Sequence, residues 1–541
     1  MTDTTTTRRT TRAERMAQPR LTDVIKAVAE EHGACIRPVQ LRKTNLDTGQ
    51  AEQVLIPCGA TLASVCLGCA ERNKVLRAGQ CREGWHLEDE PITAPPPPDD
   101  YQRWLATTLA DLLASRDQAA EHGQDTADLD ESITAFTGEL RRLGVRGSLG
   151  HTGKPKTRRK RSTRRRQDTP DLPRRKVTGR TLGRTFTAQD GKTYRPSMFL
   201  TLTCDSYGPV RDDGTPADPA SYDYQRAARD AIHFAALLDR FIQNLRRFLG
   251  YDMQYFATIE PQRRLAPHAH IALRGTVSRA DLRRVIAATY HQVWWPATHT
   301  VRYTGDQLPA WDDKRARYLD PATGELLPSW DDALDAIGPH DQPLHLARLG
   351  REFKGEGVLA SSRDSARCIG YLTKYLVKDL GTCHVPDTDA QHDHADRLVY
   401  ALRFEPCSPT CANWLRYGIT PKNPRQGLVP GYCTGKAHRP DHLGYAGRRV
   451  LVSRKWSGKT LADHRGDRKA WLMDTLGLSA TADTASYRWE KVTPSDSDYL
   501  PPPRRLLRVV AERMAWKHAL GEARRLAQER AGDVPATRRA A

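Results

Sequence analysis

Two histidines separated by a single alanine stand in the middle of the chain, at His268 and His270 in the segment PHAHIALRG. The segment has the pattern of a β-strand, and because strand side chains alternate between faces, both imidazoles project to the same side. Two neighbouring imidazoles can share one divalent cation, whereas an isolated pair is more often an ordinary surface or core feature. The histidine pair alone therefore does not predict a metal site, and further ligands are needed elsewhere in the sequence.

Candidate partners for a metal site lie on both sides of the histidines. Seven residues separate Glu260, at the end of an expected strand, from His268, and Tyr371 and Tyr375 follow about a hundred residues later. The tyrosines are spaced i, i+4, so on a helix they share one face. A metal held by two imidazoles and a carboxylate can polarise a phosphodiester, and a phenol with a pKa near ~10 needs such help to attack it. The ordered set indicates phosphodiester chemistry.

Strands and helices alternate around these residues. Residues 197–204 (SMFLTLTC) and 255–260 (YFATIE) have the pattern of strands, and a long amphipathic helix is expected between them. A second helical pattern, at 366–380, contains the tyrosines. This alternation favours an α/β or α+β arrangement in which helices cover a sheet.

The order of these segments resembles the HUH endonucleases, and specifically the rolling-circle replication initiators of actinobacterial plasmids and integrative elements. The resemblance is carried by FLTLTCDSYG, ATIEPQRRLAPHAHIALRG and CIGYLTKYLVKDL. It extends over about residues 35–90 and 190–470. It implies an α+β fold in which a central antiparallel sheet with flanking helices forms the nuclease core, joined to a cysteine-rich N-terminal unit and a basic C-terminal region.

The resemblance also implies an activity, that of a metal-dependent tyrosine DNA endonuclease and strand transferase. His268 and His270 would bind Mg²⁺ or Mn²⁺, with Glu260 as the third ligand and Gln262 as the alternative. A tyrosine would cut one strand at the double-strand origin, become joined to the 5′ phosphate and leave a 3′ hydroxyl for a polymerase. The sequence KYLVK matches the family pattern KYxxK, which points to Tyr375 as the nucleophile.

Three further residues surround the expected nucleophile. Some relatives carry a catalytic glutamate where this chain has Tyr371, so the way in which the reaction cycle ends stays open. Lys374 and Lys378 can hold phosphate or stabilise the phenolate, and a solvated helix face is the alternative.

Two groups of cysteines have spacings typical of metal sites. The first contains a Cys-x2-Cys pair and consists of Cys58, Cys66, Cys69 and Cys81. It predicts a tetrahedral structural zinc site, in which Cys35 or His86 can replace one member. The second group has looser spacing and consists of Cys407, Cys411, Cys433 and His438. Buried thiols without a metal are the alternative for both groups.

The 541 residues carry a formal net charge of +19, which favours a polyanionic partner. A basic segment near residue 455 is expected to bind DNA through cations on phosphates and an indole on a base, with an ordinary basic surface as the alternative. Its candidate residues are Arg454, Lys455, Trp456 and Lys459.

No apolar run approaches the ~20 residues of a membrane span, and the first fifteen residues do not form a secretory signal. We therefore expect a cytoplasmic protein without membrane contact. Its expected partners are origin DNA, single-stranded at the nick, and the host helicase and polymerase.

The composition predicts about three folded units and a division into segments. In chain order these are a disordered basic arm (1–29), a cysteine-rich zinc-binding unit (30–93), a proline spacer with a helical segment (94–150), a basic linker (151–190), the endonuclease core (191–400, with an insertion at about 305–345), a second Cys/His unit with a basic DNA-binding segment (401–470) and a helical C-terminal tail (471–541).

Three other functions compete with a replication initiator. A conjugative relaxase usually carries its tyrosine before the histidine motif, whereas here the tyrosines follow it. A transposase of the same class differs from a replication initiator in genomic context rather than in residue chemistry. A non-catalytic zinc-containing DNA-binding regulator would leave Glu260, the histidines and the tyrosines without a role.

Overall fold

The computed structural model describes residues 21–85, 87, 89–91, 99–143, 172–187, 189, 191, 193–305, 307–338, 340–359, 362–374, 376–377, 386–475 and 487–532. The chain divides into two compact units, residues 92–166 and the rest. The expectations for the first twenty residues and for most of the basic linker lie outside the described residues, as do those for His86, Tyr375 and Lys378.

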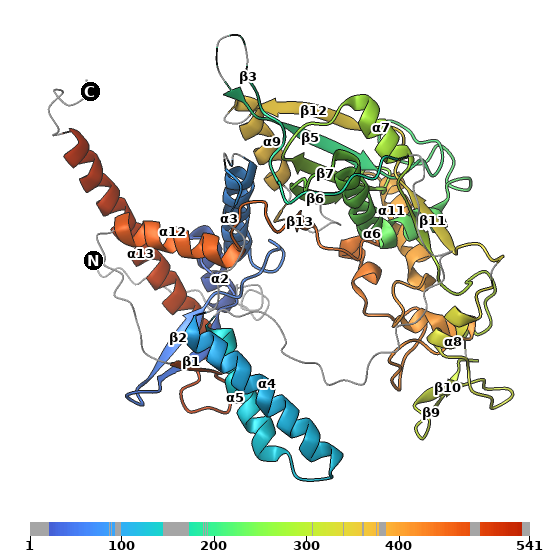
Figure 1. Cartoon of the computed structure of the whole chain (residues 1–541), viewed down its shortest axis with the longest axis horizontal. Coiled ribbons are helices and arrows are strands. Elements are labelled where there is room, and N and C mark those ends of the chain that lie inside the picture. The colour runs from blue at the N-terminus through green and yellow to red at the C-terminus, as the bar shows by residue number, and fades with distance from the viewer. Residues whose placement is uncertain are drawn as a thin grey trace, which may run out of the picture. The chain divides into compact units, whose positions relative to one another are not determined.

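A five-stranded antiparallel sheet forms the centre of the larger unit (Figure 1). Its strands, in spatial order, are β12 (Lys354–Leu359), β5 (Pro196–Thr203), β7 (Pro267–Leu273), β6 (Tyr255–Pro261) and β13 (Val450–Val452). Together with the helices below it makes the protein an α+β structure, which confirms the α+β class and the antiparallel sheet of the expected fold. The histidine strand β7 lies between β5 and β6.

The two faces of this sheet differ in character. On one face Leu200, Leu202 and Ile271 pack into the main core against helix α6 (Tyr224–Leu249). Asp223 caps the start of α6 by accepting a hydrogen bond from the Arg226 amide, and Gly250 ends it in the left-handed conformation at φ 78°. The opposite face is covered by α9 (Arg363–Lys374), which therefore holds Tyr371 over the histidine side of the sheet.

Helices and strands around the core complete the larger unit. Helices α7 (Arg279–Ala287) and α11 (Asp389–Phe404) pack against α6. The short elements are β3 (Phe186–Thr187), β4 (Thr193–Tyr194), and the 3₁₀ turns η2 (Ala412–Tyr417), η3 (Lys436–His438) and η4 (Pro440–His442). Among the described residues, none of the helices has the length and apolarity that crossing a membrane requires.

The expected insertion carries a hairpin of its own. Strands β8 (Tyr290–Val293) and β11 (His345–Arg348) pair across it, and it contains β9 (Ala310–Asp312), β10 (Arg317–Leu319) and α8 (Trp330–Asp335). Trp330 joins the small apolar cluster around Trp414, so this segment packs on the region of the second cysteine group.

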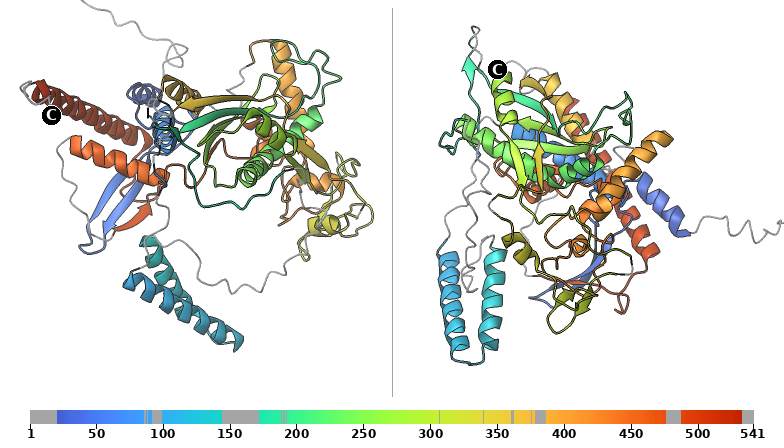
Figure 2. Two further views of the ribbon diagram at one scale, coloured as in Figure 1. Left: turned by 45° about the horizontal axis from the view of Figure 1, so that its top comes forward. Right: turned by 90° about the vertical axis from the view of Figure 1, so that its right-hand side faces the viewer.

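The N-terminal region is completed by the end of the chain (Figure 2). Its elements are α2 (Leu21–Glu31), β1 (Val39–Asn45), β2 (Ala51–Ile56), α3 (Leu67–Trp85), α12 (Leu461–Thr475), β14 (Tyr487–Lys491) and α13 (Pro502–Gly532). The sheet order is β14-β1-β2, and α13 packs against α2. Two expectations therefore need correction. Residues 21–29 form most of a helix rather than a disordered arm, and residues 487–532 belong with the N-terminal region instead of forming a separate tail.

The smaller unit is a pair of helices, α4 (Asp100–Glu121) and α5 (Ala127–Arg142). Leu105, Leu109 and Leu140 form its apolar contact. Asp99 begins α4 with a capping box, in which Gln102 returns the hydrogen bond. The unit is thus a helical hairpin stabilised by its own core.

Candidate active site and metal centres

His268 and His270 occupy adjacent same-face positions of β7. His270 pairs with Thr201 of β5, and His268 pairs with Glu260 of β6. Directly paired residues of an antiparallel sheet project to the same face, so the register places both imidazoles and the carboxylate together. The two imidazole centroids are 4.2 Å apart.

The hydrogen bonds of His270 leave one ring nitrogen aimed at the carboxylate. Its Nδ1 lies 3.1 Å from the Thr201 hydroxyl, and its Nε2 lies 4.0 Å from Glu260 Oε2. Both side chains are buried, yet His270 Nε2 and Glu260 Oε1 have no hydrogen-bond partner. A buried polar atom left in this state costs about 1–3 kcal/mol, so two at one place fit a site built for a cation.

Burial shifts the pKa of all three groups. It lowers the pKa of His268 to about 4 and that of His270 to about 3, so both imidazoles are neutral near pH 7. Burial also raises the pKa of Glu260 to about 7, against the opposing charges of Arg449 and Lys374. Neutral imidazoles and a carboxylate that titrates near neutrality are suitable ligands for a divalent ion.

A cavity of about 470 Å³ opens beside the histidines, between the sheet and α9. Tyr371 and Lys374 line it together with both imidazoles. The Tyr371 ring stands edge-on to His270 with centroids 4.7 Å apart, and 41% of the tyrosine is exposed. Of the two candidate nucleophiles, this one is within the described residues and faces the cavity.

The alternative third ligand is already engaged. Gln262 Oε1 accepts hydrogen bonds from Thr203 Oγ1 at 3.0 Å and from Arg264 Nε at 2.9 Å. Glu260 is therefore better placed than Gln262 to act as the third metal ligand beside the two histidines.

Sequence reasoning missed the charged wall of the cavity. Glu356 of β12 contacts Lys354 at 2.9 Å and Arg367 at 3.5 Å, and all three side chains line the cavity. The sequence around β12 contains no motif that indicates a site. Its position beside the histidines results from pairing with β5, a strand about 150 residues earlier in the chain. Lys354 and Arg367 give this wall cations that can face a phosphate.

The first cysteine cluster consists of Cys35, Cys58, Cys66 and Cys69, whose sulfur atoms all lie within 4.8 Å of one another. Cys66 and Cys69 stand at the start of α3, and Cys58 Sγ lies 3.6 Å from Cys69 Sγ. Burial opposes ionisation of Cys69, but hydrogen bonds from the Gly59 backbone, Cys58 and Arg72 lower its pKa to about 7. The cluster could hold a zinc ion.

Cys81 lies elsewhere, so Cys35 takes the fourth position. Cys81 lies twelve positions after Cys69 on helix α3, which is an axial rise of about 18 Å. Cys81 is instead fully buried in the apolar cluster between the sheet and α9, and burial raises its thiol pKa. The cluster thus has Cys35, the replacement that the sequence analysis allowed, in place of Cys81.

The second cluster contains all four residues expected from the spacing, Cys407, Cys411, Cys433 and His438. His438 Nδ1 lies 3.0 Å from the Leu402 carbonyl oxygen, which leaves Nε2 facing the cysteines. A side chain at Gly435 would come within 2.8 Å of Cys407 Sγ, so glycine is required where the backbone folds around the sulfurs. This cluster could also hold a zinc ion.

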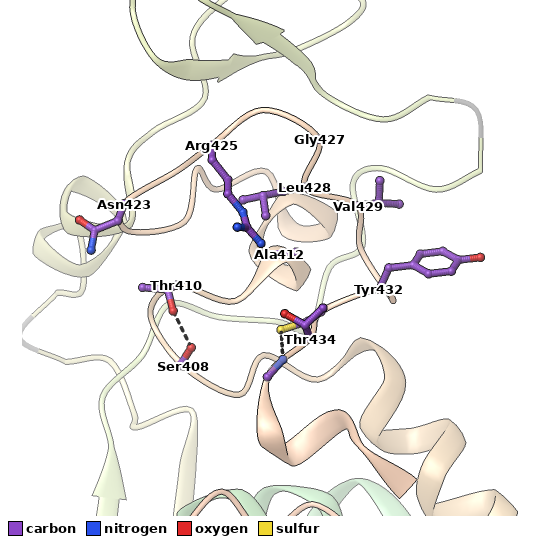
Figure 3. Close-up of a pocket in the computed structure, with 12 residues that line it drawn as sticks. Ser408, Thr410, Ala412, Asn423, Arg425, Gly427, Leu428, Val429, Tyr432 and Thr434 are labelled. Carbon is purple, nitrogen blue, oxygen red and sulfur yellow. Dashed lines mark hydrogen bonds between the residues drawn. The ribbon is translucent and has the colours of Figure 1, made fainter. Parts of the chain in front are cut away.

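A cavity of about 730 Å³ adjoins the second cluster (Figure 3). Ser408 and Thr410 share a hydrogen bond on one side of it, and Arg425 points inward from the opposite loop. Tyr432 is 71% exposed and projects away from the loop. The cavity is open and its lining is part polar and part apolar, and among the lining residues Arg425 is the one charged side chain, so this lining does not indicate a reaction centre.

The basic segment near residue 455 differs from its expected role. Trp456 is fully buried, donates a hydrogen bond from Nε1 to the Gln80 carbonyl oxygen at 3.1 Å, and packs against Gly84. Its indole therefore cannot stack on a base. Lys459 contacts Glu83 at 2.8 Å and Asp467 at 3.0 Å.

The other two residues of that segment keep more access to solvent. Arg454 is exposed, whereas Lys455 is half-buried with its Nζ 3.6 Å from Asp252. Of the four expected DNA-binding residues, Arg454 alone is exposed and without an acidic partner among the described side chains.

Comparison with known proteins identifies a family of replication initiators. Residues 21–512 match the family model RepSA, described as the replication initiator protein of pSAM2. No curated protein and no solved structure matches the chain. Because the match spans most of the sequence, the protein belongs to the RepSA family. This confirms the resemblance to replication initiators of actinobacterial plasmids.

Proposed function

We propose that this replication initiator cuts and rejoins one DNA strand at its origin through a 5′-phosphotyrosine intermediate. The observation that carries the proposal is the pair of buried, unpartnered atoms on Glu260 and His270 beside a cavity that Tyr371 lines. A buried acceptor pair of this kind is expected where a cation belongs.

Glu260, His268 and His270 would hold Mg²⁺ or Mn²⁺. A divalent ion bound there would polarise the scissile phosphodiester and orient it for in-line attack. The nucleophile and the cations that contact the phosphate are side chains of the protein.

The nucleophile is a tyrosine of the α9 region. Its phenol oxygen attacks phosphorus, the bond from phosphorus to the 3′ oxygen breaks, and the departing 3′ hydroxyl takes up a proton. The phosphotyrosine conserves the energy of the phosphodiester, so attack by a 3′ hydroxyl reverses the step and reseals the strand. The KYxxK pattern supports Tyr375, and the place of Tyr371 at the cavity supports a contribution to the same cycle.

The cations near the tyrosines would act on the phosphate. Lys374 lines the cavity, and Lys378 belongs to the same motif. An ammonium here can contact a phosphate oxygen or lower the free energy of the phenolate. Both lysines are proposed for this role.

We further propose that both cysteine clusters bind zinc for structural reasons. Each offers four soft or borderline ligands, the set that tetrahedral zinc prefers. The partners of the protein would be origin DNA, single-stranded at the nick, and a host helicase and polymerase that extend the 3′ hydroxyl.

The test combines nicking with adduct mapping. Purified protein is incubated with Mg²⁺ and supercoiled plasmid carrying its own origin, and then with a single-stranded origin oligonucleotide. We expect nicked circles and a covalent adduct that peptide mapping places on Tyr375. Tyr375→Phe removes one oxygen and should abolish the adduct, while Tyr371→Phe should keep part of the first cleavage.

Other outcomes would change the assignment. An adduct on Tyr371 would reverse the order of the two tyrosines, and an adduct on neither residue would remove the mechanism. Cleavage at the ends of a mobile element rather than at an origin would favour a transposase.

A further inference from the structure

A second cavity, of about 450 Å³, lies on the other side of the tyrosine helix. It forms a groove between α3, α9 and α12, and α3 packs against both of the other helices. Ala78 and Gly79 of α3 make a floor of small residues, and Thr373 of α9 closes one side. Because Tyr371 and Lys374 line the active-site cavity, one helix separates the two hollows, a width of about 10 Å.

The groove has an exposed aromatic wall. Trp471 of α12 lines it and is 54% exposed, in contrast to Trp456, which is fully buried. An indole that keeps a face in solvent next to a hollow can stack on an unpaired base, because every base offers a π-face. The groove therefore has the aromatic surface that the segment near residue 455 lacks.

The rim of the groove is basic. Lys74 is paired with Glu71 at 3.3 Å, whereas Arg82 and Arg468 are exposed and have no acidic partner among the described side chains. Those two guanidinium groups come from helices that are separate in sequence, α3 and α12. Both line the groove together with Trp471 and are available to a phosphate there.

Like charges crowd around the same helices. Burial lowers the pKa of Arg77, and the charges of Arg465 and Arg448 lower it further. Burial also lowers the pKa of Arg513, with additional contributions from Arg72 and Arg468. Cations that repel one another gain from an anionic partner, so the charge of this surface is complementary to a nucleic-acid backbone.

We propose that this groove binds the single-stranded DNA next to the nick, with a base on Trp471 and phosphates on Arg82 and Arg468. The inference rests on the proposed function, since it assumes that a strand enters the neighbouring active site. A single strand is favoured over a duplex because one exposed indole and a hollow of this size accept an unstacked base.

The first test removes the indole. Binding of a labelled single-stranded origin oligonucleotide to the full chain is measured by fluorescence anisotropy, with the corresponding duplex in parallel. We expect Trp471→Ala to weaken single-strand binding about 10-fold, the effect of losing one stacked base. Trp489→Ala is the matched control, because Trp489 is 51% exposed on β14 and does not line the groove.

The second test removes the cations. Arg82→Gln combined with Arg468→Gln should reduce the salt dependence of single-strand binding, lowering the slope of log K against log salt by about 1.4 for two phosphate contacts. The control combines Arg488→Gln with Arg525→Gln, which changes two exposed arginines that pair with Glu490 and Glu529 outside the groove. That control should keep the wild-type slope.

The third test fills the groove. A Cβ at Gly79 meets no atom within 4 Å, and leucine favours a helix more than glycine does, so Gly79→Leu should fold normally. It should nevertheless weaken single-strand binding at least as much as Trp471→Ala. Gly521→Leu on α13 is the control, because Gly521 is also helical and also has open space around it.

The outcomes separate this inference from the proposed chemistry. Wild-type affinity and salt slope in the Trp471, Arg82/Arg468 and Gly79 variants would overturn the groove even if the tyrosine adduct forms. Weakened binding in these variants, together with the absence of any adduct from the wild-type protein, would retain the groove and reject the nicking mechanism. A loss confined to duplex DNA would also overturn the assignment to a single strand.

Discussion

The cysteine clusters and the histidine site differ in how open they are. In each cysteine cluster, four ligand atoms lie within 4.8 Å of one another. Glu260 and His270 are also close, 4.0 Å apart, but they stand beside a cavity of about 470 Å³. The cysteines come from loops and helix ends that wrap around a point. The histidines come from one strand of a sheet, whose side chains project in parallel and leave one side open. A closed shell suits a structural ion, and an open side leaves room for a substrate. The difference predicts opposite responses to mutation.

The largest expected effect is on the closed clusters. Cys66→Ser removes one of four ligands at the start of α3, and a structural zinc site supplies on the order of 10 kcal/mol to the fold that it holds. We expect the variant to lose one zinc ion per chain and the cooperative unfolding of the N-terminal region. Metal analysis and thermal unfolding test this, and a variant that keeps all its zinc and its Tm would contradict it.

The open site should respond in activity and not in stability. His268→Ala combined with His270→Ala should reduce nicking by at least about 1,000-fold, because the electrostatic stabilisation of the phosphate is lost. The Tm and zinc content should stay close to the wild type, and so should origin binding, which depends on contacts to the DNA backbone. Normal nicking with Mg²⁺ or Mn²⁺ would show that the histidines do not hold the metal.

A smaller effect concerns pH. Glu260 has a pKa of about 7, and both histidines have pKa values of about 4 or below, so above pH 5 only the carboxyl titrates. Metal binding must displace its proton, so the affinity for Mn²⁺ should fall about 10-fold for each pH unit below 7 and level off above it. Calorimetric titration across this range measures the slope. Glu260→Gln should bind more weakly and lose the pH dependence, and an unchanged slope in that variant would assign the proton to another group.

The smallest expected effect tests whether Cys81 is a zinc ligand, as its spacing in the sequence suggested. Cys81→Ala removes one buried sulfur from an apolar environment, which should cost about 1 kcal/mol of unfolding free energy and leave the zinc content unchanged. A parallel measurement on Cys35→Ala should show loss of one zinc ion. The reverse result, with zinc lost from Cys81→Ala alone, would restore the ligand set expected from the sequence.

The sequence predicts those parts of the fold and site that depend on local periodicity. Alternation along a strand is sufficient to place His268 and His270 on one face, and a two-residue spacing is sufficient to bring Cys66 and Cys69 together. The same reasoning predicts the α+β class. In each case the relevant residues are only a few positions apart.

Features that depend on distant pairing could not be predicted in this way. Trp456 is surrounded by basic residues in the sequence, yet it is buried because Gly84 on α3 leaves room for its indole, and a side chain there would collide with it. Cys35 reaches the first cluster because the chain folds back between α2 and β1. Such contacts depend on the packing of helices and strands that are far apart in the sequence, and a local sequence pattern carries no information about that packing.

The pairing of β1 with β14 has a consequence for the time at which the protein can fold. Gln40 donates a hydrogen bond to the Asp498 carbonyl oxygen across 458 positions of the chain. At about 5–20 residues per second, a ribosome needs roughly 25 to 90 seconds to deliver the second partner after the first. During that interval β1 has an open edge, which is a template for unwanted pairing with other chains. The three-stranded sheet can be completed only after β14 has been synthesised, so a translation product that stops before residue 487 would leave one edge of β1 unpaired.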